Sequence, residues 1–179
     1  MKASPSELEA DGWAFALDVY ARPGIADACL SLQNEAGVDV MMLLVIAFAA
    51  ARLRILPTPA EIHELDQACS PWREQIVWPL RAIRSGLKSG PMPAPSTDTE
   101  QFRSKIKTVE LAAERLQTRL LTERLPRRPP KPDAVTAEEV RAILGCVVSL
   151  FIDERGKRPD AELFPSIDKI VDAVMHGVR

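Results

Sequence analysis

The sequence predicts an all-α protein, a helical bundle around one buried apolar helix with a C-terminal helical appendage. Four segments carry the Ser/Thr-x-x-Glu pattern that is typical of helix starts. Glycine is scarce, with 8 in 179 residues, and alternating β-branched runs are few, which argues against a β-sandwich. Residues 40–51 contain no polar side chain, so we expect this segment to be the central helix.

The predicted helix starts are capping boxes, in which a hydroxyl accepts from a backbone N–H and the Glu carboxylate accepts from the cap's own N–H. Pro5 and Pro59 occupy the first helical position, where the missing N–H costs nothing. Ser70-Pro71 has the cap and the proline without the Glu, and we interpret it as a fifth start. The four boxes pair Ser4 with Glu7, Thr58 with Glu61, Thr97 with Glu100, and Thr136 with Glu139.

Apolar residues at helical spacing place the first five helices. Gly37 is the expected end of the second helix, and Asp39 is the expected N-cap of the third. Pro79 lies inside the fifth helix, so we expect a kink or two shorter helices there. The expected ranges are 5–21, 23 to Gly37, 40–55, 59–69 and 71–88.

A sixth helix, over about 98–125, has apolar residues at alternating steps of four and three, which is a heptad seam. The seam is too short for an independent coiled coil, so we expect the helix to dock on the bundle. A homodimer through the seam is the alternative. The seam residues are Phe102, Ile106, Val109, Ala113, Leu116 and Leu120.

A proline- and arginine-rich connector over 126–135 follows the sixth helix. Two further helices are expected over 137–155 and 167–176, the latter capped by Ser166 and ended by Gly177. We therefore divide the chain into a bundle domain over 1–125, the connector, and a C-terminal helical segment over 136–179.

Cysteine and histidine usage predicts neither a disulfide framework nor a metal site. Cys29, Cys69 and Cys146 are far apart and odd in number, as expected for reduced thiols. His63 lies among carboxylates, but the sequence has no HExxH or ExxH pattern, so we expect no metal and no cofactor. The longest apolar run has twelve residues, against about 20 for a membrane span. We expect a cytoplasmic protein without a membrane partner.

Charge is unevenly distributed along the chain. Residues 71–131 carry a net charge of +7, between acidic segments of −6 and −3. A basic stripe on the fifth helix is the candidate partner-binding site, because such an arc suits phosphate or an acidic protein. The alternative is a solvated face, or ion pairing within the fold with interleaved residues such as Glu110 and Glu114. The stripe consists of Arg73, Arg81, Arg84 and Lys88.

A second candidate site is a pocket near the central helix, where polar groups on the first three helices could converge on a small ligand. The candidate residues are Tyr20, Gln33, Asp39 and Arg52. Motifs of catalysis are missing: the sequence has no G-x-S-x-G elbow, no Gly-rich phosphate loop, and no basic residue beside Cys29 to activate its thiol. We therefore assign no catalytic residue.

A set of motifs over 13–88, which extends towards 125, resembles a small proteobacterial family described as a domain of unknown function. The resemblance implies a bacterial, cytoplasmic, helical protein with Trp13, Tyr20 and Trp72 as core anchors, and it supplies no catalytic residue. Met41-Met42 departs from the polar residue expected after Asp39-Val40. The motifs are Trp13-x-Phe15-Ala16, Tyr20-x-x-Pro23-Gly24, Ala28-Cys29-Leu30-x-Leu32-Gln33, Gly37-x-Asp39-Val40, Trp72-Arg73 and Pro79-Leu80-Arg81-x-x-Arg84-x-x-Leu87-Lys88.

The leading functional hypothesis is a non-enzymatic adaptor or regulatory protein-binding module that takes an acidic protein partner on its basic stripe. One alternative is a nucleic-acid or ribosome-associated protein that uses the same basic middle. The other is a small-ligand-binding protein or enzyme with the pocket near the central helix.

Overall fold

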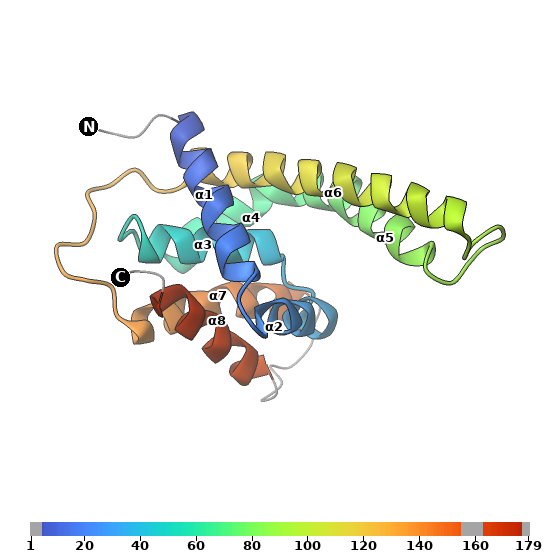
Figure 1. Ribbon diagram of the computed structural model, residues 1–179. Helices are drawn as coiled ribbons and strands as arrows, with labels where there is room; N and C mark the ends of the chain where they lie inside the picture. The colour runs from blue at the N-terminus through green and yellow to red at the C-terminus, as the bar shows by residue number, and fades with distance from the viewer. Residues whose placement is uncertain (1–4, 155–162, 177–179) are drawn as a thin grey trace.

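The computed structural model describes residues 5–154 and 163–176, and within these ranges all regular secondary structure is helical (Figure 1). The all-α prediction is therefore confirmed. The elements are α1 (Pro5–Tyr20), α2 (Ile25–Ser31), η1 (Leu32–Ala36), α3 (Val40–Ala51), α4 (Pro59–Trp72), η2 (Arg73–Val77), α5 (Trp78–Gly86), α6 (Thr97–Arg124), α7 (Ala137–Glu154) and α8 (Phe164–His176), where η marks π-helical turns.

The central helix is α3, which is buried on every side, because it has no polar residue to present to water. Each side chain from Met42 to Ala50 is at most 2% exposed. Asp39 is its N-cap, as predicted, and accepts from the Met42 N–H at 3.1 Å. The helix ends at Ala51, four residues before the predicted end, and Arg54 then adopts a left-handed backbone conformation with φ of 53°.

The C-terminal helices share this core. Buried residues of α7 and α8 belong to the same hydrophobic cluster as α3, and α8 also packs on α2. The connector is held against the bundle, since the Lys131 N–H donates to the Arg54 carbonyl at 2.9 Å. The proline-rich boundary at 126–135 therefore does not divide the core. No helix in the described ranges has both the length and the apolar character to cross a membrane.

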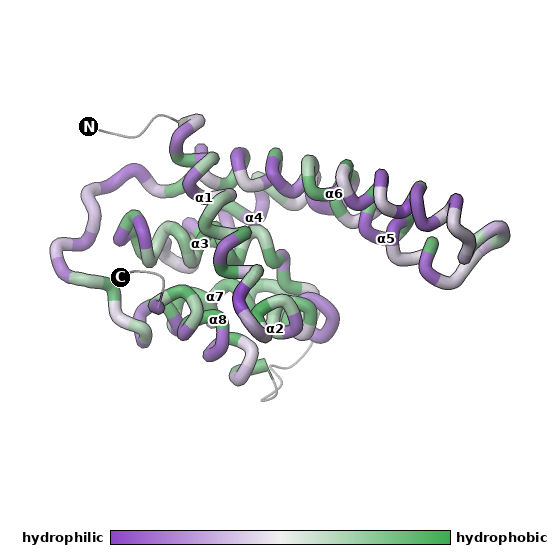
Figure 2. Tube along the Cα trace, viewed as in Figure 1, coloured by the Kyte–Doolittle hydropathy of each residue, from purple (hydrophilic) through white to green (hydrophobic). Residues whose placement is uncertain are grey.

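A helical hairpin projects from this body. α4, η2 and α5 follow one another without a break, and α6 returns beside them, so that the α5 end of the pair extends beyond the other helices (Figure 1). Hydrophobic and hydrophilic residues alternate along this projecting part (Figure 2).

The predicted helix start at Ser70-Pro71 is wrong, because α4 continues through Pro71. Pro71 lacks the N–H that would bond the Gln67 carbonyl, and the Ser70 hydroxyl donates to that carbonyl instead. The interruption expected at Pro79 occurs just before it, where the π-helical turn η2 gives way to α5. Proline in the second position of the new α-helical segment breaks no hydrogen bond within that segment.

Two capping boxes are confirmed, those of Thr58 with Glu61 and Thr136 with Glu139. The box predicted at Thr97 is wrong: the N-cap of α6 is Ser96, and Thr99 takes the role of the Glu. Gly37 ends η1 with φ of 72°, as predicted. Ser166 lies inside α8, which begins at Phe164. Ser4 and Gly177 lie outside the described residues.

Candidate functional site

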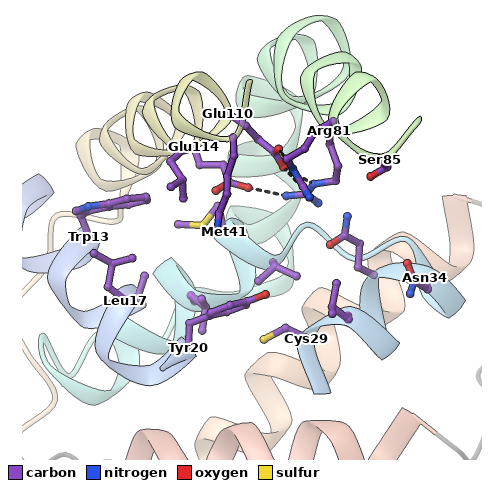
Figure 3. Close-up of a pocket in the computed structure, with 18 of the residues that line it drawn as sticks. Trp13, Leu17, Tyr20, Cys29, Asn34, Met41, Arg81, Ser85, Glu110 and Glu114 are labelled. Atoms are coloured by element: carbon purple, nitrogen blue, oxygen red, sulfur yellow. Dashed lines mark hydrogen bonds and ion pairs between the residues drawn. The ribbon is translucent and has the colours of Figure 1, made fainter. Parts of the chain in front are cut away.

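A cleft of about 620 Å³ lies where the projecting hairpin meets the N-terminal helices. Its apolar side is formed by α1, α2 and the first turns of α3, with Trp13, Leu17 and Met41 facing the space (Figure 3). Its charged side is formed by α5 and α6. The cleft therefore combines an apolar wall with a charged one, as binding sites for amphipathic ligands do.

The charged wall is a network of two arginines and two glutamates that joins the two arms of the hairpin (Figure 3). Arg81 donates from Nε to Glu110 Oε1 at 3.0 Å and from Nη2 to Glu114 Oε1 at 2.5 Å. Arg84 donates to both oxygens of Glu110. Residues three or four apart on a helix share a face, so each arm presents its pair to the other.

The pKa values of the two glutamates are shifted in opposite directions. Burial alone would raise the pKa of Glu110, but hydrogen bonds from Arg84 and Arg81 outweigh it and lower the pKa below the ordinary 4.5. For Glu114 burial prevails over the single contact from Arg81, and the pKa is raised. Glu110 is therefore held as a carboxylate near neutral pH with its acceptor sites occupied by guanidinium groups.

Tyr20 and Cys29 lie in the same cleft (Figure 3). Burial raises the pKa of the Cys29 thiol to about 12, so that the thiol stays protonated at neutral pH. Burial also raises the pKa of Tyr20, so the phenol keeps its proton as a hydrogen-bond donor. These groups offer hydrogen bonds and apolar surface rather than a nucleophile.

Two lysines at the charged wall, Lys88 and Lys107, are exposed. Within the described ranges, neither forms an ion pair with another side chain. Together with the balanced network of Arg81, Arg84, Glu110 and Glu114, they leave the cleft with a net charge of +2.

Arg73, expected on the basic stripe, lies in the interior and is 2% exposed. It donates to Asp66 Oδ1 at 2.6 Å and to Asp39 Oδ2 at 3.3 Å, and Gln117 donates to the same Asp39 oxygen. Its guanidinium lies 5.0 Å from the centroid of the Phe151 ring. Arg73 therefore joins α3, α4, α6 and α7 from inside, and the prediction that it contacts a partner is wrong.

The remaining predicted site residues fall into two groups. Tyr20 and Gln33 line the cleft together with Arg81, Arg84 and Lys88, so parts of the two predicted sites form one site. Asp39 and Arg52 lie outside it. Asp39 is 6% exposed as a helix cap, and the Arg52 guanidinium lies 5.7 Å from the centroid of the Phe15 ring. Tyr20 is 39% exposed, so it is not the core anchor that was expected.

Part of the cleft does not follow from the sequence. Trp13 packs against the core, as expected, and also lines the cleft. Lys107, Glu110 and Glu114 belong to the basic middle in the sequence, and only the structure places them in the cleft. The spacing of Glu110 and Glu114 by four residues, opposite arginines three apart, is the signal that could have paired the two arms.

Replacing Glu110 with Gln should lower the free energy of unfolding by about 1.5–3 kcal/mol at neutral pH, because two partly buried guanidinium groups lose a charged acceptor. The folded-state pKa of Glu110 lies below 4.5, so its contribution is present above that pH and is lost as the pH falls through the lowered value. The difference between the variant and the wild type should therefore shrink in acid. Urea denaturation at neutral and acidic pH measures it.

Glu100→Gln is the matched control, since Glu100 forms an exposed ion pair with Arg103 three residues along the same helix. It should change stability little. An equal loss in both variants, or a loss for Glu110→Gln that persists unchanged in acid, would contradict the assigned role of the network.

Comparison with known proteins places the chain in a family. A family model described as "Protein of unknown function (DUF2390)" matches residues 11–121, and the chain belongs to this family. The matched range includes every residue that lines the cleft and ends before α7. No curated protein and no solved structure shows significant similarity to the chain.

Proposed function

We propose that this member of the DUF2390 family is a non-enzymatic protein-binding module, and that an acidic segment of a partner protein occupies the cleft. The observation that carries the proposal is the composition of the cleft, which has exposed apolar side chains on one wall and, on the other, two lysines that pair with no side chain in the described part of the chain. The apolar residues at its rim, Leu17, Tyr20, Leu30 and Leu111, are 39–49% exposed.

Apolar exposure at the rim favours a polypeptide over a small molecule. Small-ligand sites bury most of the ligand in a concave space, whereas side chains half exposed at a rim are covered only by a larger partner. Exposed apolar side chains that gather around one cleft are typical of interaction surfaces on soluble proteins. The net charge of +2 then selects a segment that carries Asp or Glu beside its apolar residues.

A binding role also fits the chemistry of the groups in the cleft. The Cys29 thiol is protonated at neutral pH, and Glu110 is saturated by two guanidinium groups. Neither group is poised as a nucleophile or a general base. We therefore propose recognition without chemistry.

Nucleic-acid binding has less support, because many cations of the basic middle are engaged within the fold. Arg81, Arg84, Arg103, Arg115 and Arg119 each pair with a carboxylate. Cations that are already paired release fewer counterions from a phosphate backbone than free ones do, and counterion release drives such binding.

The free cysteines favour a reducing compartment. Cys29 and Cys69 are buried as free thiols, and Cys146 is also free. Reduced thiols are the usual state in the cytosol. With the resemblance noted from the sequence, this supports a protein that works in the bacterial cytoplasm.

The partner can be identified by a photo-activatable amino acid placed at Leu17, with the same substitution at Phe164 as the control. Leu17 lies at the rim of the cleft, and Phe164 is exposed on α8. We expect a protein adduct from Leu17 only, and mass spectrometry should place the cross-link in an acidic segment. Adducts that are equal at the two positions would contradict the proposal.

Reversing both free lysines, in Lys88→Glu/Lys107→Glu, should weaken binding of that segment at least about tenfold, or about 1.4 kcal/mol. The loss should diminish with added salt, because rim charges are screened. Isothermal titration calorimetry with the purified segment measures it. Lys169→Glu/Arg127→Glu makes the same change in net charge away from the cleft and should leave affinity unchanged. An equal loss in both double variants would assign the effect to net charge alone.

A further inference from the structure

The side of the hairpin opposite the cleft carries a second exposed apolar surface, which we call the outer face: Ile83, Phe102, Val109 and Leu116. Their side chains are 49–53% exposed. At about 100° per residue they lie roughly 130–170° around their helices from the residues that line the cleft. The outer face is therefore a separate surface from the cleft.

No charged residue interrupts this surface along α6. The apolar row from Phe102 to Leu120 repeats at steps of four and three residues, and its members between the exposed ones are half-buried (Ile106 and Leu120) or buried (Ala113). On α5, Ile83 and Leu87 continue the surface. An uncharged strip two helices wide is the kind of surface that packs on other helices.

We propose that the outer face is the interface of a homodimer in which the hairpins of two copies pack antiparallel as a four-helix bundle. The size of the outer face supports the proposal that a second copy of the chain covers it. Phe102 and Leu120 are eighteen residues apart, which gives a length of about 27 Å, and two adjacent helices give a width of about 18 Å. Two such surfaces bury about 1,000 Å², the lower end for specific protein interfaces.

Charges at the edge of the strip favour the antiparallel arrangement. Lys105 and Glu123 lie on the same edge of α6, eighteen residues and therefore five turns apart. A two-fold axis that crosses the helices near residue 114 places Lys105 of each copy beside Glu123 of the other, where it would join the ion pair that Glu123 forms with Arg119 of its own chain. The same axis sets the small Ala112 against the large Leu116 of the second copy, and a two-fold axis repeats this contact on both sides.

Analytical ultracentrifugation from low to high micromolar concentration tests the proposal. We expect the wild type to dimerise, and we expect Leu116→Glu and Val109→Glu each to raise the dimer dissociation constant at least tenfold. Phe164→Glu adds the same charge at an equally exposed aromatic residue on α8 and should dimerise like the wild type. Circular dichroism spectra should agree among all variants, because each replaced side chain is about half exposed.

Substitutions of Lys105 and Glu123, at the edge of the strip, test whether the two hairpins pack antiparallel. Lys105→Glu should weaken the dimer, and the exchange Lys105→Glu/Glu123→Lys should restore it. A wild type that stays monomeric, a dimer that survives Leu116→Glu, or an exchange that fails to restore association would each overturn the proposal. The cleft lies on the other side of the hairpin, so these results leave the proposed partner binding to its own test.

Discussion

Replacing Arg73 with Met should lower the free energy of unfolding by about 3–5 kcal/mol, because removing one member of a buried ion network leaves uncompensated charge inside the protein. Arg73, Asp39 and Asp66 are each at most 6% exposed. Burial opposes the charge of Arg73, but Asp39 and Asp66 raise its pKa, so the cation persists in the folded state. Without it, two carboxylates remain in the interior, and Asp66 loses its hydrogen-bond donor.

The penalty should come from the stranded carboxylates more than from the lost contact. We therefore expect Arg73→Met/Asp39→Asn/Asp66→Asn to recover at least half of the stability that the single substitution removes. Asn at residue 39 still accepts the Met42 N–H, so the cap of α3 is kept. Urea denaturation followed by circular dichroism, at one protein concentration, measures both variants. A single substitution that costs under about 1 kcal/mol would contradict the interpretation.

The case of Arg73 shows where helical periodicity fails as a guide to function. Counting residues places Arg73 near the face of Arg81 and Arg84, and all three belong to one continuous helical path. The stretch that contains Arg73 runs through the body, where Asp39 and Phe151 cover it, whereas Arg81 belongs to α5 and pairs with glutamates of α6 in the hairpin. Periodicity gives the direction of a side chain but not which other helix lies there.

Predictions from local sequence signals succeeded where both interacting residues lie close together along the chain. The boxes of Thr58 and Thr136, the cap at Asp39 and the end at Gly37 depend only on residues up to five apart, and the structure contains all of them. The box at Thr97 failed because adjacent hydroxyls compete for the cap, and Ser96 has a suitable partner in Thr99. The buried apolar helix followed from composition alone, since twelve apolar residues have no face suited to water.

The cleft could be predicted only in part, because it depends on tertiary contacts. Tyr20 and Gln33 were expected to converge near the central helix, and both line the cleft. Arg81 was expected on a different surface, because its pairing with Glu114 spans 33 residues, and no local pattern reports a contact at that separation. Residues of two surfaces that were predicted separately therefore line one cleft, and only the three-dimensional structure brings them together.

Replacing Phe48 with Ala should cost about 3–5 kcal/mol, the range for truncating a buried phenylalanine. Its ring is 2% exposed and lies 5.6 Å from the Phe15 ring, centroid to centroid, at a tilt of 55°. The opposite wall cannot easily close the resulting cavity, because Gly12 has no side chain there and a Cβ at that position would already lie 3.1 Å from the Thr122 methyl carbon. A loss of this size approaches the whole stability of a typical domain.

Phe164→Ala makes the same chemical change at an exposed ring on α8 and should alter the free energy of unfolding by less than about 0.5 kcal/mol. Thermal and urea unfolding of both variants measure the difference. A further substitution, Gly12→Ala, should partly fill the space left in Phe48→Ala, although it crowds Thr122 in the wild type. Its effect on stability should therefore be more favourable in Phe48→Ala than in the wild type, since neighbours that share a cavity are not additive. Equal effects in both backgrounds would show that α1 does not pack on Phe48 as described.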